Sequence, residues 1–362
     1  MKKTLRMGFT TGSCAAAAAC AAAQLLVTGK AVPFVMLHTP KKITIFLEIA
    51  ESSLSGNCAT CAVLKDSGDD PDVTNGVLVY ATVSLRSDGE ISIDGGEGVG
   101  RVTLPGLDQA VGSAAINSVP RQMIRQAVRN VLGEGRGAHV VISIPAGREL
   151  AARTFNPRLG IVGGISVLGT SGIVEPMSED ALRETIRVEL NIRRAQGMDS
   201  LVMAPGNYGR DFLQKHYGVS PDTVVLCSNF IAEAVEMAAK MGFRSLLFAG
   251  HIGKLVKVAA GVRNTHSKYG DGRMATIADI VSRHCTPEAF PALRDKITAC
   301  VSCDEAVRIL KAEGLADAVL ADMGRAILQT MSRWAGKAMQ VSVIVFSNVY
   351  GVLYSRLEFG ES

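Results

Sequence analysis

Hydrophobic and polar positions follow two different patterns in the two halves of the chain. In the first half, an alanine-rich stretch over residues 13–27 precedes short apolar runs separated by Gly and Asp turns, which predicts a helix packed on short strands. In the second half, the apolar runs 201–204, 224–227 and 245–249 each end in a loop of Gly, Ser or Asn that leads into a helical pattern. Hydrophobic strands that alternate with helices are typical of a parallel sheet.

The length of 362 residues favours two domains, because a single hydrophobic core seldom organises so long a chain. We expect a mixed α+β domain over residues 1–155. An α/β domain should follow over residues 156–362, Rossmann-like, with a doubly wound, mostly parallel sheet, a helical tail and C-terminal strands. Ligands of such sheets bind beyond the carboxyl ends of the strands, so the loops after the strands are where chemistry is expected first.

Composition and charge narrow the classes of function. The chain has 38 basic and 34 acidic residues and no run of Lys and Arg with interleaved aromatics, which argues against a nucleic-acid partner and suits an anionic small molecule. The polar stretch 8–13 interrupts the position of a signal-peptide core, and no apolar run reaches the ~18 residues of a membrane span. We therefore expect a cytoplasmic protein without a membrane partner, and a homo-oligomer is left open.

Eight cysteines in a chain of this length indicate free thiols rather than a disulfide framework. Two Cys-x-x-Cys pairs, Cys58/Cys61 and Cys300/Cys303, lie at opposite ends of the chain. Zinc sites usually bring two such pairs close together in the sequence, so buried free cysteines are the favoured interpretation and no metal site is expected.

Five segments carry more Gly, Asp, Asn, His and Arg than folding alone requires. They are residues 8–13, 65–76, 95–101, 143–178 and 250–273. Each also has a plain structural explanation, respectively a helix N-cap, a solvated turn, a turn between strands, a glycine-rich hairpin and a loop with satisfied histidines. The fifth segment follows a predicted strand, which favours function there.

Two of these segments predict specific chemistry. Crowded aspartates in residues 65–76 should raise one another's pKa, so that one carboxylate accepts a proton near neutrality. Paired glycines and hydroxyls in residues 160–175 let a ligand lie against the backbone, and Glu175 stands where a ribose-binding carboxylate would.

The motifs together resemble the cobalt-precorrin-5B (C1)-methyltransferases of the oxygen-independent cobalamin pathway. The matching strings are GFTTGSCAAAAA (8–19), KDSGDDPDVTNG (65–76), GGEGVGR (95–101), PRQMI (120–124), SIPAGREL (143–150), FNPRLGIVGGISVLGTSGIVEPMS (155–178), GNYG (206–209) and FAGHIGKLVKVAAGVRNTHSKYGDGR (248–273). Small departures at Ser67 and Arg263 leave the charged positions unchanged, and the residues after 273 add little to the resemblance.

The resemblance implies methyl transfer from S-adenosylmethionine, as cosubstrate, to carbon C1 of cobalt-precorrin-5B, giving cobalt-precorrin-6A. The anionic cobalt corrinoid brings its own cobalt and carries acetate and propionate arms. Transfer from a sulfonium needs alignment more than a strong acid. A nicotinamide- or flavin-dependent oxidoreductase is one alternative, which the absence of a G-x-G-x-x-G turn opposes. A non-catalytic corrinoid carrier is another.

The candidate site residues fall into three groups by expected role. The expected catalytic residues are Asp66, Asp69 and Asp70. The expected cofactor-binding residues are Gly163, Gly164, Gly169, Thr170, Gly172 and Glu175. The expected substrate-binding residues are Thr10, Thr11, Ser13, Arg121, Arg148, His251, Lys254, His266, Lys268 and Arg273. The last group combines hydroxyl and cationic donors because such donors match carboxylate arms.

Overall fold

The computed structural model describes residues 5–357 and divides the chain into two compact units, Met1–Glu179 and Asp180–Ser362. The boundary predicted after residue 155 differs from this division. Residues 156–178 belong to the first unit because β10 (Ile161–Val162) and β11 (Ile173–Val174) pair with strands of that unit, β8 (Arg101–Val102) and β1 (Gly8–Phe9). The fold is mixed α/β with two multi-stranded mixed sheets.

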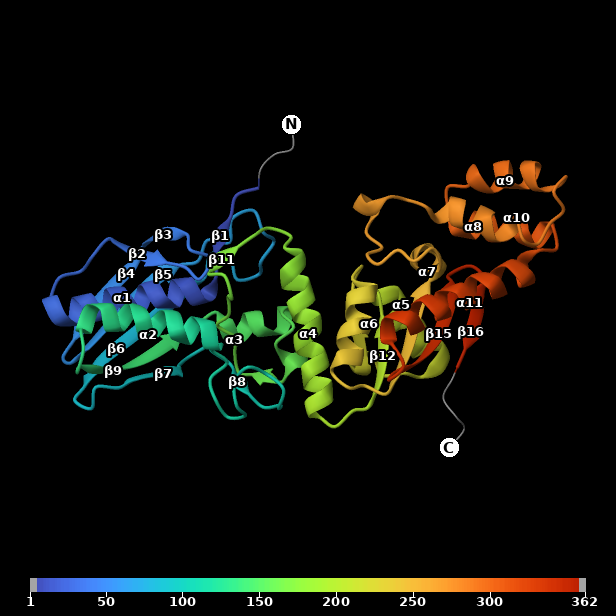
Figure 1. Ribbon diagram of the computed structural model, residues 1–362. Coiled ribbons are helices and arrows are strands. Elements are labelled where there is room, and N and C mark those ends of the chain that lie inside the picture. The colour runs from blue at the N-terminus through green and yellow to red at the C-terminus, as the bar shows by residue number, and fades with distance from the viewer. Residues whose placement is uncertain (1–4, 358–362) are drawn as a thin grey trace. The chain divides into compact units, whose positions relative to one another are not determined.

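The first unit is built on a five-stranded sheet of order β4-β5-β6-β9-β7, in which only β7 and β9 run parallel. Its strands are β4 (Glu51–Ser55), β5 (Cys58–Leu64), β6 (Leu78–Arg86), β7 (Ile91–Gly95) and β9 (Gly137–Ser143). Helices α1 (Thr11–Thr28) and α2 (Ser118–Leu132) pack on one another and on the same face of this sheet (Figure 1). A two-stranded ribbon, β2 (Phe34–His38) and β3 (Thr44–Glu48), lies beside α1 and β5.

Helix α1 confirms the helix expected from the alanine-rich stretch. The Thr10 side chain accepts a hydrogen bond from Ser13 N at its start, and Gly29, with φ of 69°, ends it in the left-handed conformation. Its alanines are fully buried, since small side chains let the helix approach both α2 and the sheet. Among the described residues, α1 is the one helix long and apolar enough to cross a membrane, and 78% of that stretch is buried inside the protein, as in a core helix.

The second unit has a five-stranded sheet of order β13-β12-β14-β15-β16, with three parallel pairings and an antiparallel last one. Its strands are β12 (Ser200–Ala204), β13 (Val224–Leu226), β14 (Ser245–His251), β15 (Gln340–Ser347) and β16 (Gly351–Arg356). The three apolar runs of the sequence are β12, β13 and β14. The strand order changes direction at β12, because β13 lies on one side of it and β14 on the other.

Helices cover both faces of this second sheet. Helix α5 (Asn207–Tyr217) packs on one face through Phe212 and Leu213, and α6 (Ile231–Lys240), α7 (Ile252–Ala259) and α11 (Ala316–Ala335) contribute to the larger core on the other. The remaining helices of residues 5–357 are α3 (Gly147–Leu150), α4 (Glu179–Ala195), α8 (Arg273–Val281), α9 (Phe290–Thr298) and α10 (Cys303–Ala312), with short 3-10 turns η1 (Ala151–Arg153), η2 (Pro157–Leu159), η3 (Pro221–Thr223) and η4 (Ser267–Tyr269).

Candidate functional site

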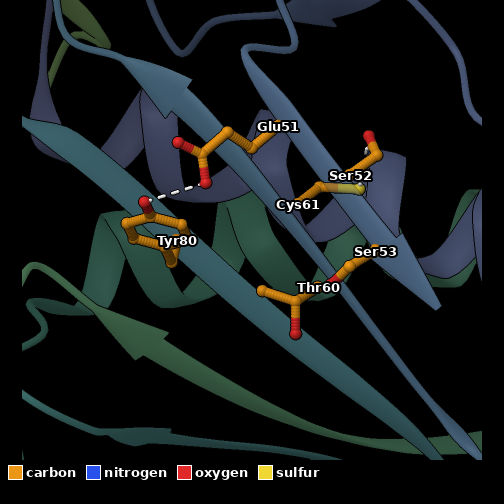
Figure 2. A pocket seen from close by; sticks show the side chains of 6 residues that line it. All are labelled: Glu51, Ser52, Ser53, Thr60, Cys61 and Tyr80. Atoms are coloured by element: carbon orange, nitrogen blue, oxygen red, sulfur yellow. Dashed lines mark hydrogen bonds between the residues drawn. The ribbon is translucent and has the colours of Figure 1, made fainter. Parts of the chain in front are cut away.

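A polar hollow of about 360 Å³ lies on β4, β5 and β6 of the first unit (Figure 2). It is lined by Glu51, Ser52, Ser53, Thr60, Cys61 and Tyr80. The Tyr80 hydroxyl donates a hydrogen bond to Glu51 Oε2 at 3.0 Å. None of the predicted site residues lies here, and the Glu51 carboxylate makes the hollow unsuitable for a polyanionic ligand.

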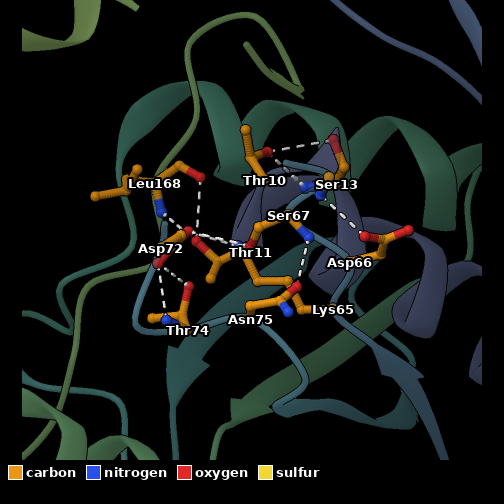
Figure 3. A network of polar contacts seen from close by, with 11 residues as sticks. Thr10, Thr11, Ser13, Lys65, Asp66, Ser67, Asp72, Thr74, Asn75 and Leu168 are labelled. Carbon is orange, nitrogen blue, oxygen red and sulfur yellow. Dashed lines mark hydrogen bonds and ion pairs between the residues drawn. The ribbon is translucent and has the colours of Figure 1, made fainter. Parts of the chain in front are cut away.

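Three of the predicted segments meet at the start of α1 (Figure 3). Thr11 Oγ1 donates to the Leu168 carbonyl at 3.2 Å and accepts from Leu168 N at 3.0 Å. Ser13 Oγ donates to the Gly172 carbonyl at 2.6 Å, and Thr10 Oγ1 accepts from Ser13 N. All three hydroxyl side chains are buried. Their hydrogen bonds therefore hold the glycine-rich segment on the helix, which gives these predicted substrate-binding donors a structural role.

The aspartate loop is organised around a buried lysine that the sequence analysis did not select. Lys65 is 2% exposed, and its Nζ donates to Asp72 Oδ2 at 2.7 Å and to the Ser67 hydroxyl. Asp72 Oδ1 also accepts from Thr74 N and Thr74 Oγ1. Burial opposes ionisation of Asp72, but the hydrogen bond and charge of Lys65 lower its pKa below the usual value. The loop is thus a folded unit with its own partly buried ion pair.

The three aspartates predicted to be catalytic each face a donor within the chain. Asp66 forms an ion pair with Arg6, Asp69 Oδ2 accepts from Arg6 N at 2.8 Å, and Asp70 Oδ1 accepts from Met177 N at 2.9 Å. The hydrogen bond from Arg6 is the main cause that lowers the pKa of Asp66 below its usual value. The expected mutual rise in pKa is wrong for Asp66, because a guanidinium rather than another carboxylate is its nearest charge.

Three of the glycines predicted to bind a cofactor, Gly164, Gly169 and Gly172, are required by close packing or backbone conformation in the first unit. A Cβ at Gly164 would lie 2.2 Å from the Gly98 carbonyl oxygen, and one at Gly169 would lie 2.3 Å from Thr10 Oγ1. Gly172 adopts a φ of 79°, a region that favours glycine. These residues therefore already have a structural reason to be glycine that involves no ligand.

The other predicted cofactor residues lie at the surface of the same segment. Gly163 and Thr170 are exposed, and no heavy atom lies within 4 Å of a Cβ built on Gly163. Glu175 forms an ion pair with Lys41, and both side chains are about 40% exposed. The Glu175 carboxylate is thus reachable, but it already has a cationic partner.

Arg121, predicted to bind substrate, has a structural role in the first unit. Its guanidinium donates to the carbonyls of Ile116 and Ile93, each at 2.8 Å, and of Ala114 at 3.2 Å. Burial lowers the pKa of this guanidinium. Arg121 thus links α2 to the edge of the sheet. Arg148, by contrast, is exposed on α3.

The second unit has a pocket of about 350 Å³ next to the start of α7. It is lined by Asn229, Gly253, Lys254, Lys257, Thr265, His266, Ser267, Asp271 and Arg273. Three residues predicted to bind substrate, Lys254, His266 and Arg273, come together here. Three cationic side chains against one carboxylate make the pocket positive and suited to an anion.

Hydrogen bonds between three elements hold the pocket walls together. Lys257 Nζ donates to the Gly270 carbonyl at 2.9 Å and to the Thr265 carbonyl at 3.3 Å. Thr265 N in turn donates to the Asn229 carbonyl at 3.0 Å. The loop over residues 264–271 is therefore fixed to α7 and to the segment that follows β13. Sequence reasoning missed Lys257, which lies in the last turn of α7, and Asn229, although Asn229 lies in the loop that follows a predicted strand.

Lys254 is the functional candidate that stands out in this pocket. It is half-buried in the first turn of α7, which contains no acidic residue. Among the described residues, its ammonium has no hydrogen-bond or ion-pair partner, and burial lowers its pKa below the ordinary value. A cation at the positive end of a helix dipole is destabilising unless an anion binds there. The arrangement therefore favours an anionic ligand.

Two of the predicted side chains of this region, His251 and Lys268, lie outside the pocket lining, and Arg273 in the lining is paired. His251 caps α7, since its Nδ1 accepts from Gly253 N at 3.1 Å, and burial lowers the pKa of its imidazole. Lys268 lies with its Nζ 4.9 Å from the ring centre of Tyr269. Arg273 donates to both carboxylate oxygens of Asp271 at 2.6 Å. Neither His251 nor Lys268 lines the pocket.

The cysteines form no cluster that suggests a metal site. Cys61, Cys300 and Cys303 are buried, and Cys58 is exposed. In the part of the chain that the structure describes, no group of three or more His, Cys, Asp or Glu side chains is placed to hold a metal ion.

Comparison with known proteins gives consistent matches over almost the whole chain. The CbiD family model matches residues 1–176, and the model of the CbiD C-terminal domain matches residues 264–356. A protein of Alkaliphilus metalliredigens named cobalt-precorrin-5B C(1)-methyltransferase is 42% identical over 97% of this chain and 92% of its own length. A protein of the same name from Ruminiclostridium cellulolyticum is 43% identical over 99% of this chain and 94% of its own length.

A solved structure is also similar to the chain. It is described as the cobalamin biosynthesis protein (cbiD) from Archaeoglobus fulgidus, with 27% identity and a TM-score of 0.37. The match covers 73% of this chain and 83% of that one.

Proposed function

The chain belongs to the CbiD family, and on that premise we propose that it methylates carbon C1 of cobalt-precorrin-5B in cobalamin biosynthesis, giving cobalt-precorrin-6A. The observation that carries this proposal is the identity of 41–46% to relatives named cobalt-precorrin-5B C(1)-methyltransferase, over most of their length. The protein is accordingly an enzyme, a C-methyltransferase that acts on a cobalt-containing substrate.

S-adenosylmethionine is the methyl donor in this proposal. Its sulfonium is a good leaving group, so the protein's contribution is to align the methyl carbon with C1 and to exclude water. The glycine-rich segment over residues 160–175 remains our prediction for the donor site. Fewer of its residues now support this site, because Gly164 and Gly172 are buried, whereas Gly163, Thr170 and the Glu175 carboxylate are accessible to solvent.

The positive pocket of the second unit binds a carboxylate arm of the corrinoid. Lys254 supports this assignment, because it is half-buried, lies in the first turn of α7 and has no anionic partner among the described residues. The same charge argues against the donor as occupant. A sulfonium held about 7 Å from one lysine ammonium would be repelled by about 2 kcal/mol at an effective dielectric of about 20. A carboxylate at that distance would be attracted by a similar amount.

The topology of the second sheet supports a ligand at this position. In our interpretation the sheet is doubly wound, since α5 and α6 pack on opposite faces and the strand order changes direction at β12. Asn229 follows β13 and Lys254 follows β14, so both stand beyond carboxyl ends of parallel strands. This is where open α/β sheets bind their ligands.

Asp69 and Asp70 remain our candidates for a catalytic carboxylate, whereas Asp66 serves to fix Arg6. Asp69 accepts a hydrogen bond at Oδ2 from Arg6 N, and Asp70 accepts one at Oδ1 from Met177 N. Among the described residues, this leaves the other oxygen of each carboxylate for substrate. Asp70→Asn keeps an oxygen acceptor for Met177 N and removes only the charge. We expect single-turnover methylation to slow by about tenfold or more, about 1.4 kcal/mol in the barrier, with the Tm unchanged. Wild-type turnover in this variant would refute the role.

Binding of the donor separates this function from its alternatives. Calorimetric titration with S-adenosylmethionine should give saturable binding to the purified protein. An oxidoreductase or a non-catalytic corrinoid carrier needs no site for this molecule. Corrinoid binding with no binding of S-adenosylmethionine, measured with and without the corrinoid present, would therefore favour the carrier.

A further inference from the structure

The outward face of the β2–β3 ribbon in the first unit carries an exposed apolar patch. Phe34, Met36 and Phe46 are 58%, 54% and 66% exposed, and all three lie on this face. Met36 and Phe46 are direct cross-strand partners at the middle of the ribbon. The three side chains therefore form one continuous patch rather than scattered surface residues.

Buried and exposed side chains alternate along both strands, and apolar residues occupy exposed as well as buried positions. The inward side chains Val35, Leu37, Ile45 and Leu47 are buried in the core of the first unit. An antiparallel ribbon with one buried face ordinarily carries polar side chains on its other face. Here three of the six outward side chains are large and apolar, and they adjoin one another between the polar ones. An exposed patch of this kind marks an interaction surface.

The two ends of the ribbon carry opposite charges. Glu48 is the one carboxylate in β2 and β3, and it pairs across the ribbon with Phe34 at one end. His38 and Thr44 pair at the other end, next to Lys42 in the turn that joins the strands. Glu48 and Lys42 are both exposed. The patch is therefore apolar at its centre, acidic at one end and basic at the other.

We propose that this ribbon face is the contact surface of a homodimer. A two-fold interface uses the same patch on both copies, so the patch must be complementary to itself. A two-fold axis that crosses the ribbon at the Met36/Phe46 pair meets this condition. It packs the apolar centres on each other and brings the Glu48 end of one copy onto the Lys42 end of the other, twice in each dimer. Charge complementarity thus selects a second copy of this chain as the occupant.

Sedimentation analysis of the full-length protein over a range of concentrations tests the proposal through charge reversal. The wild type should be a dimer. Glu48→Lys places like charges at both ends and should weaken dimerisation by about tenfold or more. The double variant Lys42→Glu with Glu48→Lys reverses both signs and should restore the dimer. Circular dichroism spectra and melting curves check that each variant is folded.

Phe46→Ser provides an independent variant that keeps every charge. It should shift the wild-type dimer toward monomer, because the centre of the patch loses its largest exposed side chain. A wild type that is monomeric at all concentrations overturns the proposal. If Phe46→Ser then also lowers the Tm, the ribbon face is covered by another part of the same chain. A dimer that persists unchanged in Glu48→Lys and Phe46→Ser overturns it as well.

Discussion

Replacement of Lys254 by glutamine removes the one half-buried cation of the positive pocket that has no anionic partner among the described residues. Glutamine keeps much of the side-chain length and a hydrogen-bond donor, so the pocket should keep its shape. The corrinoid should then bind more weakly, because one carboxylate arm loses its ion pair and its interaction with the charge at the start of α7.

The expected loss follows from two opposing contributions. The attraction between two unit charges 4 Å apart is about 4 kcal/mol at an effective dielectric of 20. Part of it is offset, because burial already disfavours the charged form of Lys254 and lowers its pKa. Hydrogen bonds to charged groups contribute about 1.5–3 kcal/mol net. A loss of about 2 kcal/mol, or about 30-fold in Kd, is therefore expected.

Spectrophotometric titration with a polycarboxylate cobalt corrinoid measures this Kd at several salt concentrations. Lys337→Gln, at an exposed position of the same unit, is the matched control, since it removes the same charge outside the pocket. The wild-type affinity should fall as ionic strength rises, and Lys254→Gln should show the weaker salt dependence. Equal affinities for Lys254→Gln, Lys337→Gln and the wild type would refute the assignment of the pocket to the substrate.

Three further predictions concern stability and the donor. Lys65→Met should lower the free energy of unfolding by about 3 kcal/mol in urea titrations, because it leaves the partly buried Asp72 carboxylate without its cationic partner. A decrease of less than about 1 kcal/mol, the usual contribution of an exposed ion pair, would contradict this prediction. The pKa of His251 is lowered in the folded protein, so below pH 6.5 the unfolded chain binds a proton that the native helix cap excludes. The free energy of unfolding should therefore be highest above the ordinary pKa of 6.5 and should fall as the pH drops below it. His251→Asn should flatten this pH dependence in melting curves, and an unchanged slope would refute the prediction. Glu175→Gln should weaken S-adenosylmethionine binding in calorimetry by about 1–3 kcal/mol, whereas Lys41→Met should not, and equal effects would mean that the ion pair only positions the segment.

Local patterns of the sequence predicted the elements of the fold well. The alanine-rich helix is α1, and the three apolar runs of the second half are β12, β13 and β14. The domain boundary was placed too early, because the pairing of β11 with β1 joins segments far apart in the sequence. A local sequence pattern cannot predict such a pairing, because the pairing depends on the tertiary fold that brings the two distant segments together.

The sequence brought together part of the candidate pocket, and the predicted side chains that have other partners share one physical cause. Lys254, His266 and Arg273 do line one pocket, because loops that follow parallel strands meet at one edge of a sheet. The Arg121 guanidinium instead donates hydrogen bonds to three backbone carbonyls. Asp70 accepts a hydrogen bond from Met177 N, 107 residues away in the sequence. Sequence shows which side chains are capable of binding an anion or a proton. It does not show which backbone groups reach them first.

Transfer of an isotopically labelled methyl group tests the central claim most directly. The purified protein is incubated with cobalt-precorrin-5B and with S-adenosylmethionine labelled in its methyl group, and the product is examined by nuclear magnetic resonance and mass spectrometry. We predict that one labelled methyl group appears on carbon C1 and that S-adenosylhomocysteine forms in equal amount. Label on another ring carbon, or an unchanged corrinoid in the presence of folded protein and both substrates, would contradict the account.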